Sequence, residues 1–274
     1  MTNLQRVAAS DAAYLKIVLD PIYVCAQYRS KFGQGAKGGG LTLSQFQTLY
    51  RGDSFYNWFG LDNPLMYAAH KAAGGMTSIY RQIGIGCEAL FRRILQDTLG
   101  LSDSDVRWSY EIPTPGGKTR TLYLDGRVPL AAIKDSSARQ RFHGWMAESA
   151  TSVGVDERVF QTLTGTVFEV RQGYKSMDSK RQNADIANAT NAYVHFYLPV
   201  IALMSLQIDE VLVTRYTASR WLILRGRKGG TPFDSTYAFC REVVGYDLAA
   251  FFERNSPRIR AVLEDVLKNL MESK

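Results

Sequence analysis

The chain has 274 residues, 46% of them hydrophobic, and its formal net charge is +7 with an isoelectric point of about 9.3. Its three cysteines and three histidines are too scattered for a disulfide framework, a zinc site or a metalloprotease motif. The basic balance favours a polyanionic partner, because binding to phosphates releases their counterions.

The sequence gives no sign of a leader peptide or a membrane span. Acidic residues interrupt the apolar N-terminal stretch, which therefore lacks the layout of a signal peptide. The longest apolar run, 196–206, is about half as long as a membrane-spanning helix. We therefore expect a soluble cytoplasmic protein without membrane contact.

The first third of the chain is predicted to be helical. Apolar periodicity indicates a helix over 4–32, which the glycine-rich stretch beginning at Gly33 ends, and short helical pieces over 42–74. A stronger helix is expected over Thr77–Leu99, with Gly100 after its last turn. The glycine-rich stretch lacks the order of a phosphate-binding loop and is best explained as a connector.

Strands and helices alternate in the remainder. Strands over 106–112 and 119–124 flank a Pro-Thr-Pro-Gly-Gly-Lys turn and predict a hairpin. A helix over 136–163, a strand over 166–174, a long helix over 183–206, strands over 210–216 and 220–224, and a helical C-terminus follow. This order predicts an α/β (α+β) fold in which helices flank a mixed β-sheet.

Asp125 directly follows a predicted strand and precedes Gly126, which turns the chain. A carboxylate at this point is exposed at the end of a sheet and is positioned to bind a metal ion. The same pattern also fits an aspartate that simply begins a turn.

The strand over 166–174 carries charged residues among apolar ones. Because side chains alternate, Glu169, Arg171, Gly173 and Lys175 share one face. A carboxylate in an apolar strand is costly unless it is paired or holds a cation. Phosphodiester hydrolysis uses such carboxylates to hold Mg²⁺, which activates the attacking water. A Glu–Arg pair on a half-exposed strand is the alternative explanation.

A polar segment leads from this strand into the next helix. Its side chains suit the edges of DNA bases, and a helix N-terminus can also bind phosphate. The candidate DNA-reading residues are Asp178, Lys180, Arg181, Gln182 and Asn183. Solvated polar residues after a helix cap would produce the same pattern.

The stretch from Arg215 to Lys228 contains five basic residues and no acidic residue. Its last three, Arg225, Arg227 and Lys228, precede Gly229 and suit a loop that lies against a phosphate backbone. A solvated basic surface is the alternative.

Together these features resemble the PD-(D/E)XK nuclease superfamily, and within it the type II restriction endonucleases, over residues 78–254. The helix from Ser78 resembles the first core helix of these enzymes, which places Glu88 where a glutamate commonly faces the active site. Asp125 matches the aspartate that ends the second core strand, and 169–175 match the strand with the acid and the lysine. The stretch 244–252 resembles a Gly-x-Asp-aromatic stretch near the C-terminus of such enzymes.

The family's strand usually carries an acid, one further residue and a lysine, whereas this chain has Glu169-Val-Arg171. Either Arg171 stands where the lysine usually does, or Lys175 is the catalytic lysine. In the second case Glu169, Asp185 or Glu88 would complete the metal site, as in restriction enzymes of CCGG-type sequences, whose acid lies on the following helix. We favour Lys175, because arginine cannot lose a proton to manage a nucleophilic water.

The resemblance implies Mg²⁺-dependent, sequence-specific hydrolysis of double-stranded DNA that leaves 5′-phosphates, on a restriction-endonuclease-like core. Its catalytic residues would be Glu88, Asp125, Glu169 and Lys175, with Asp125 and Glu169 as metal ligands. A palindromic target implies a homodimer. A structure-specific repair or recombination nuclease and a non-catalytic DNA-binding protein are the alternatives.

No linker or repeat divides the sequence, so we expect one nuclease domain over 1–274. Its parts would be an N-terminal helical part over 1–75, a catalytic core over 76–254 and a C-terminal helix over 255–274.

Overall fold

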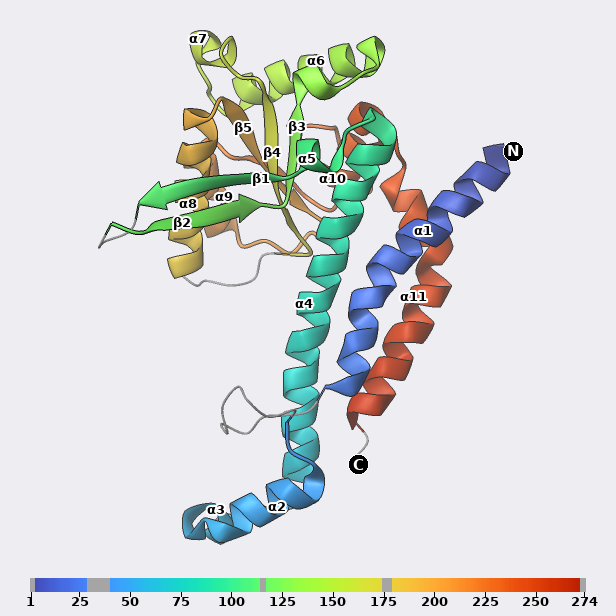
Figure 1. Cartoon of the computed structure of the whole chain (residues 1–274), viewed down its shortest axis with the longest axis vertical. Coiled ribbons are helices and arrows are strands. Elements are labelled where there is room, and N and C mark those ends of the chain that lie inside the picture. Colours follow the sequence, from blue (N-terminus) through green and yellow to red (C-terminus); the bar gives the residue numbers. More distant parts are fainter. Residues whose placement is uncertain (1–2, 29–39, 114–116, 174–178, 272–274) are drawn as a thin grey trace. The chain divides into compact units, whose positions relative to one another are not determined.

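A computed structural model describes residues 3–28, 40–113, 117–173 and 179–271. The chain folds into two compact units, one made of 1–86 with 254–274 and the other of 87–253 (Figure 1). Within the described ranges, no helix is long and apolar enough to cross a membrane.

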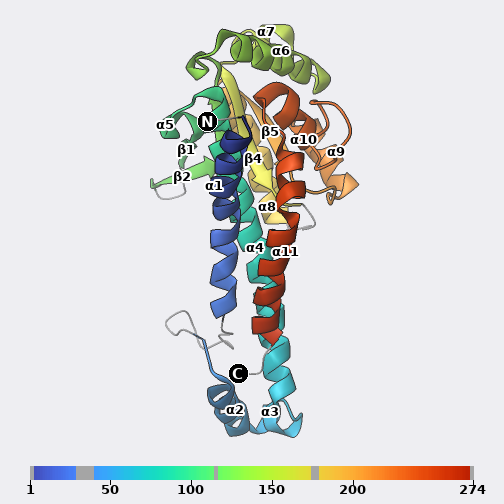
Figure 2. The same ribbon diagram turned by 90° about the vertical axis from the view of Figure 1, so that its right-hand side faces the viewer.

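The first unit is helical. It contains α1 (Asn3–Tyr23), the 3₁₀ helix η1 (Val24–Gln27), α2 (Leu43–Gly52), α3 (Ser54–Trp58), and parts of α4 (Pro64–Leu99) and α11 (Leu248–Met271). In both views, α1, α4 and α11 run side by side (Figures 1 and 2). Their shared core is formed by Leu19, Ile22, Cys25, Ile79, Val262, Val266 and Leu270. At Gly86 a Cβ atom would lie 3.0 Å from the Val18 carbonyl oxygen, so α4 can approach α1 this closely because glycine lacks one.

The second unit holds the sheets. The strands β1 (Trp108–Pro113) and β2 (Thr119–Leu124) form an antiparallel hairpin, as predicted. The other sheet has the order β3-β4-β5-β6, made of β3 (Gly126–Pro129), β4 (Gly165–Arg171), β5 (Tyr197–Leu203) and β6 (Leu222–Leu224). β3 is antiparallel to β4, whereas β5 and β6 continue parallel to it. The predicted α+β class with a mixed sheet is therefore confirmed.

Short and long helices connect and cover these strands. They are α5 (Asp103–Val106), η2 (Leu130–Ala132), α6 (Ser136–Ser152), α7 (Glu157–Phe160), α8 (Ser179–Val194), α9 (Glu210–Ala218), α10 (Thr236–Phe239) and the π-helix η3 (Cys240–Val244). One apolar cluster joins the hairpin, α8, α9 and one face of the sheet through residues such as Trp108, Ile201 and Trp221. On the opposite face, the rings of Phe91 and Phe239 pack against Phe168.

Two predicted elements are wrong. The segment over 210–216 is not a strand but lies in α9, where the Asp209 side chain caps the helix by accepting from Val211 N at 2.8 Å. The β-branched residues of this segment favour a strand locally, but burial of Leu212 and Tyr216, four residues apart, favours the helix.

The long helix predicted over 183–206 is also wrong, because α8 ends at Val194 and the apolar run forms β5. Phe196 adopts a left-handed backbone conformation with φ of 63°, which separates the two elements. An apolar run of this length fits a buried helix as well as a buried strand, and here the sheet decides.

Candidate active site

Asp125 lies at the bend between β2 and β3, and two hydrogen bonds join it to β4. Its backbone N–H donates to the Phe168 carbonyl at 2.9 Å, and its Oδ2 accepts from the Val170 N–H at 2.8 Å. On the α4 side, Arg92 Nη1 donates to the Asp125 carbonyl oxygen at 2.8 Å. The carboxylate is therefore held at a fixed place beside the end of β4.

Glu169 and Arg171 project from the same face of β4, as strand alternation predicts. Arg171 Nη2 lies 2.5 Å from Glu169 Oε1 and 3.1 Å from Asp185 Oδ1 of α8. The three side chains are between 4% and 12% exposed. One guanidinium group therefore joins two buried carboxylates from two elements.

Two residues of the neighbouring segments hold Asp185 in place. The Tyr216 hydroxyl donates to Asp185 Oδ2 at 2.8 Å, and Trp221 Nε1 donates to its backbone carbonyl at 3.1 Å. Both aromatic side chains are almost fully buried. The position of the Asp185 carboxylate is thus set by the packed core between α8, α9 and β6.

Glu88 of α4 approaches the same charges from another side. Burial, and after it the charge of Asp125, raises the pKa of Glu88 from 4.5 to about 7, while Arg92 and Arg171 oppose the rise. A glutamate with this pKa is partly protonated at neutral pH, because neighbouring acids disfavour a second negative charge.

The pKa values of the acids on the sheet, Asp125 and Glu169, are also raised. Burial is the main reason that the pKa of Asp125 is raised, although the Val170 N–H opposes the rise. Burial and then the charge of Asp125 raise the pKa of Glu169 well above its ordinary value, and Arg171 lowers it in part. Glu88, Asp125, Glu169 and Asp185 therefore form one acidic cluster around Arg171.

The chemistry of this donor set fits a hard cation such as Mg²⁺, which prefers carboxylate oxygens. Across the described residues, no hydrogen bond engages Glu88 Oε1 or Oε2, or Asp125 Oδ1, so these oxygens are available to a cation. In the same part of the chain, no three acidic, histidine or cysteine side chains converge on one metal position. Arg171 supplies the positive charge between Glu169 and Asp185.

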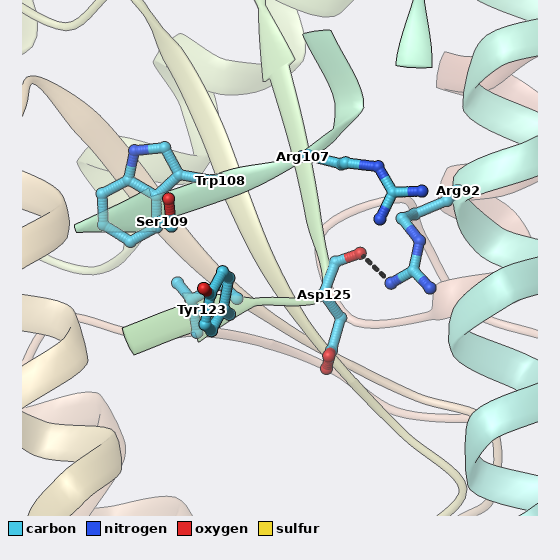
Figure 3. A pocket seen from close by; sticks show the side chains of 7 residues that line it. Arg92, Arg107, Trp108, Ser109, Tyr123 and Asp125 are labelled. Carbon is cyan, nitrogen blue, oxygen red and sulfur yellow. Dashed lines mark hydrogen bonds between the residues drawn. The ribbon is translucent and has the colours of Figure 1, made fainter. Parts of the chain in front are cut away.

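A pocket of about 370 Å³ opens beside Asp125 (Figure 3). It is lined by Arg92, Arg107, Trp108, Ser109, Tyr123, Leu124 and Asp125. These residues come from α4, the hairpin and the two positions that flank it. A pocket with two arginines in its lining thus lies beside the acidic cluster, within the same unit.

Of the predicted catalytic residues, the structure brings Glu88, Asp125 and Glu169 together, and Lys175 lies outside the described residues. Among the predicted DNA-reading residues, Asp178 also lies outside them, and Lys180 and Arg181 are described only as backbone in the first turn of α8.

The side chains of Gln182 and Asn183 lie near Arg215. Gln182 is 2% exposed and its Oε1 accepts a hydrogen bond from Arg215 Nη1. Asn183 is exposed, and its Oδ1 lies 3.5 Å from Arg215 Nη2. Within the described residues, Arg215 thus links α9 to the start of α8.

The predicted backbone-binding residues of the basic stretch each have an acidic partner. Arg225 forms two hydrogen bonds with Glu210, at 2.8 and 2.9 Å. Arg227 pairs with Asp234 at 3.1 Å, and Lys228 pairs with Glu253. The side chains of these pairs are 42% to 73% exposed, except that of Arg225, which is 25% exposed. Exposed pairs contribute about 0–1 kcal/mol, so a polyanion could compete with the acidic partners.

Arg92 and Arg107 lie outside the motifs that marked the other site residues, and Asp185 was only one of three acids predicted to complete the metal site. Arg92 follows Glu88 by four residues, so helical spacing alone places both on one side of α4. Arg107 alternates with Ser109 along the strand, which puts both on one face.

No family model matches the chain, and neither a curated protein nor a solved structure matches it.

Proposed function

We propose that this chain is a Mg²⁺-dependent endonuclease that cleaves double-stranded DNA at specific sites, of the type II restriction kind. The observation that carries the proposal is the acidic cluster of Glu88, Asp125 and Glu169, whose pKa values are all raised. Buried acids of like charge need a cation to ionise together at neutral pH.

The order of elements around the cluster supports the same proposal. A helix with Glu88 is followed by the hairpin, by Asp125, by the acid-bearing β4, and then by α8 and the parallel strand β5. This order agrees with the resemblance to PD-(D/E)XK nucleases, in which an aspartate after one strand and an acid on the next act together. A restriction-endonuclease-like core is thus part of the proposal.

The residues would divide the work as follows. Asp125 and Glu169 would hold Mg²⁺, with Glu88 beside them, and the ion when bound stabilises charge on the phosphate and lowers the pKa of the attacking water. Asp185 holds the Arg171 guanidinium beside Glu169, which limits the negative charge of the site. Lys175 is the residue that we expect to orient the water, and cleavage would leave a 5′-phosphate.

DNA is the proposed partner because the chain has a net charge of +7 and carries basic residues beside the site. Arg181 and Asn183 near the start of α8 are proposed to read bases, with Arg225, Arg227 and Lys228 along the backbone. A homodimer would place one site on each strand of a palindromic target.

The test is incubation of supercoiled plasmid and of a mixed-sequence genomic DNA with the purified chain, with Mg²⁺ or with EDTA. We expect discrete fragments with Mg²⁺ only. Smearing or nicking would indicate a structure-specific or non-specific nuclease instead. Retarded DNA without any cleavage, over a range of Mg²⁺ and Mn²⁺ concentrations, would indicate a non-catalytic DNA-binding protein.

A further inference from the structure

The pocket beside Asp125 is built by strand alternation. Ser109 pairs with Tyr123 across the hairpin, and Trp108 pairs with Leu124. Trp108 and Leu124 belong to the apolar core, so the neighbouring residues Ser109 and Tyr123 point to the opposite face. Arg107 lies two residues before Ser109, and Asp125 lies two residues after Tyr123. The same alternation therefore places both on the face of Ser109 and Tyr123. The hairpin therefore presents polar groups to the pocket as a direct result of its register.

Two positive charges meet at this face. The side chains of Arg92 and Arg107 lie beside each other at the pocket, where the Arg92 guanidinium is turned to the Asp125 carbonyl (Figure 3), although they come from α4 and from the position before the hairpin. The charges of Arg107 and Arg92 both help to lower the pKa of Asp103, after its hydrogen bond with Arg107, so the two arginines lie within reach of the same acid. Two like charges that line one pocket are stabilised by an anion bound between them.

Both arginines retain donors for a ligand. Arg92 uses Nη1 to hold the Asp125 carbonyl, and Arg107 uses Nε to pair with Asp103 at 2.7 Å. The pair with Asp103 is about two-thirds exposed on each side and is therefore weak. Among the described residues, no hydrogen bond engages either terminal nitrogen of Arg107.

We propose that this pocket binds one phosphate of the DNA backbone, next to the phosphate at the acidic cluster. Arginine, serine and tyrosine are all donors that proteins use for DNA phosphates, and here Arg92, Arg107, Ser109 and Tyr123 converge. Tyr123 is 72% exposed, so its side chain is accessible to a ligand. This inference rests on the proposed function, because it names DNA as the ligand.

The experiment measures binding of a labelled mixed-sequence duplex by fluorescence anisotropy, without divalent metal, at about 50 to 200 mM KCl, a range in which phosphate contacts dominate the salt dependence. The variant is Arg107→Gln. The matched control is Arg158→Gln, which removes the same charge from the exposed helix α7, where the Arg158 side chain is 92% exposed and pairs only with Asp156 among the described residues. Thermal unfolding midpoints confirm that all three proteins are folded.

We expect Arg107→Gln to weaken binding about tenfold at low salt and to lower the slope of log K against log salt by about one. Arg158→Gln should change neither quantity beyond the small general effect of one charge. Equal effects of the two variants, or no effect of Arg107→Gln, would overturn the phosphate site.

A further arm separates DNA from free phosphate. Replacing chloride with a few millimolar inorganic phosphate at constant ionic strength should leave duplex affinity unchanged. A loss confined to the wild type would show that free phosphate competes with the duplex for this pocket, which supports the site; a loss of the same size in Arg107→Gln would place the competition elsewhere.

The two proposals can fail separately. If the wild type cleaves plasmid but Arg107→Gln binds and cleaves normally, the phosphate site is wrong and the nuclease stands. If Arg107→Gln loses affinity but the wild type never cleaves, the phosphate site stands and the nuclease is wrong. A wild type that binds no DNA would overturn both.

Discussion

The two faces of β4 differ in how they are buried. On one face Phe168 and Val170 are at most 1% exposed, and Phe168 packs against the rings of Phe91 and Phe239 with centroids 5.1 and 5.6 Å away. On the other face Glu169 and Arg171 are buried among charges, with Asp185 opposite. Alternate residues of one short strand thus belong to an apolar core and to an ionic cluster.

The difference shows which face stabilises the fold. Burial of large apolar side chains is favourable, whereas taking charges out of water costs energy that their mutual attraction repays only in part. An apolar residue at Glu169 would serve the fold at least as well as the acid does. A function for the charged face explains why charged residues are kept there despite the free energy needed to bury them. Four experiments test that explanation.

The largest effect is expected at Asp125, which lies at the bend between β2 and β3 and is hydrogen-bonded to β4. Asp125→Ala should lower DNA cleavage by more than about 10³-fold, because it removes a proposed metal ligand and with it the activated water. DNA binding should remain measurable. The measurement is the single-turnover cleavage rate of plasmid DNA with saturating Mg²⁺.

The matched control is Asp156→Ala, since that aspartate also accepts a backbone N–H, from Arg158 at 2.9 Å, but is half exposed where it caps α7. The control should retain full activity. A folded Asp125→Ala protein that cleaves normally would remove Asp125 from the site and leave the charged face without this explanation.

The second experiment tests whether Lys175 or Arg171 supplies the positive charge at the reacting centre. Lys175→Ala should lose several orders of magnitude in cleavage rate, while Arg171→Ala should retain substantial activity, because lysine can manage a proton and arginine cannot. Rates are compared at saturating Mg²⁺ and DNA, at a temperature where both variants are folded. The opposite ranking would assign the lysine role to Arg171 and shift the reacting centre back along the strand.

The third experiment compares the two faces by stability. Phe168→Ala should lower the free energy of unfolding by about 3–5 kcal/mol through loss of burial and the cavity left behind. Arg171→Ala should cost a similar amount, about 3–5 kcal/mol, because it leaves buried carboxylates without their cation. Urea denaturation monitored by circular dichroism measures both.

The contrast appears when the charges are removed together. A triple variant Glu169→Leu, Arg171→Met, Asp185→Asn should be clearly more stable than Arg171→Ala alone, since no buried charge is left unpaired. If it is as unstable as Arg171→Ala, the charged face stabilises the fold in its own right and the comparison between the faces is mistaken.

The smallest effect concerns pH and Glu88. Its pKa is raised from 4.5 to about 7, so the folded state holds this proton more tightly than the unfolded state. Its contribution to stability is therefore fully present below pH 4.5 and is lost as the pH rises through about 7. Asp125 and Glu169 shift in the same direction.

Glu88→Gln should accordingly be more stable than the wild type at pH 8 and nearly equal to it at pH 5. Urea midpoints of both proteins at the two pH values give the comparison, and subtraction of the two profiles cancels the other groups that titrate. Parallel profiles would mean that Glu88 is exposed to water and does not share the charges of the cluster.

The sequence by itself predicted the elements whose signals are local. The hairpin followed from alternation on both sides of a glycine-containing turn, and the shared face of Glu169 and Arg171 followed from the period of a strand. The position of Asp125 at the end of β2 could also be predicted, because a turn residue marks it. These features depend on residues only a few positions apart, so short sequence patterns are enough to predict them.

Where local signals were ambiguous, tertiary structure decided. The residues over 210–216 have strand propensity, yet burial of Leu212 and Tyr216 against the core made them helical. The apolar run after Phe196 joined the sheet as β5 between β4 and β6, because pairing on both sides satisfies its backbone groups.

Only the tertiary structure set the partners of the charges. Arg171 meets Asp185 because the crossover from β4 through α8 to β5 brings that face of the helix onto the strand, and Tyr216 and Trp221 then fix the carboxylate. Arg92 and Arg107 line one pocket because α4 packs beside the hairpin, although helix and strand periods place each residue on its own face. Which faces meet depends on packing between distant segments, and no local pattern of residues encodes that choice.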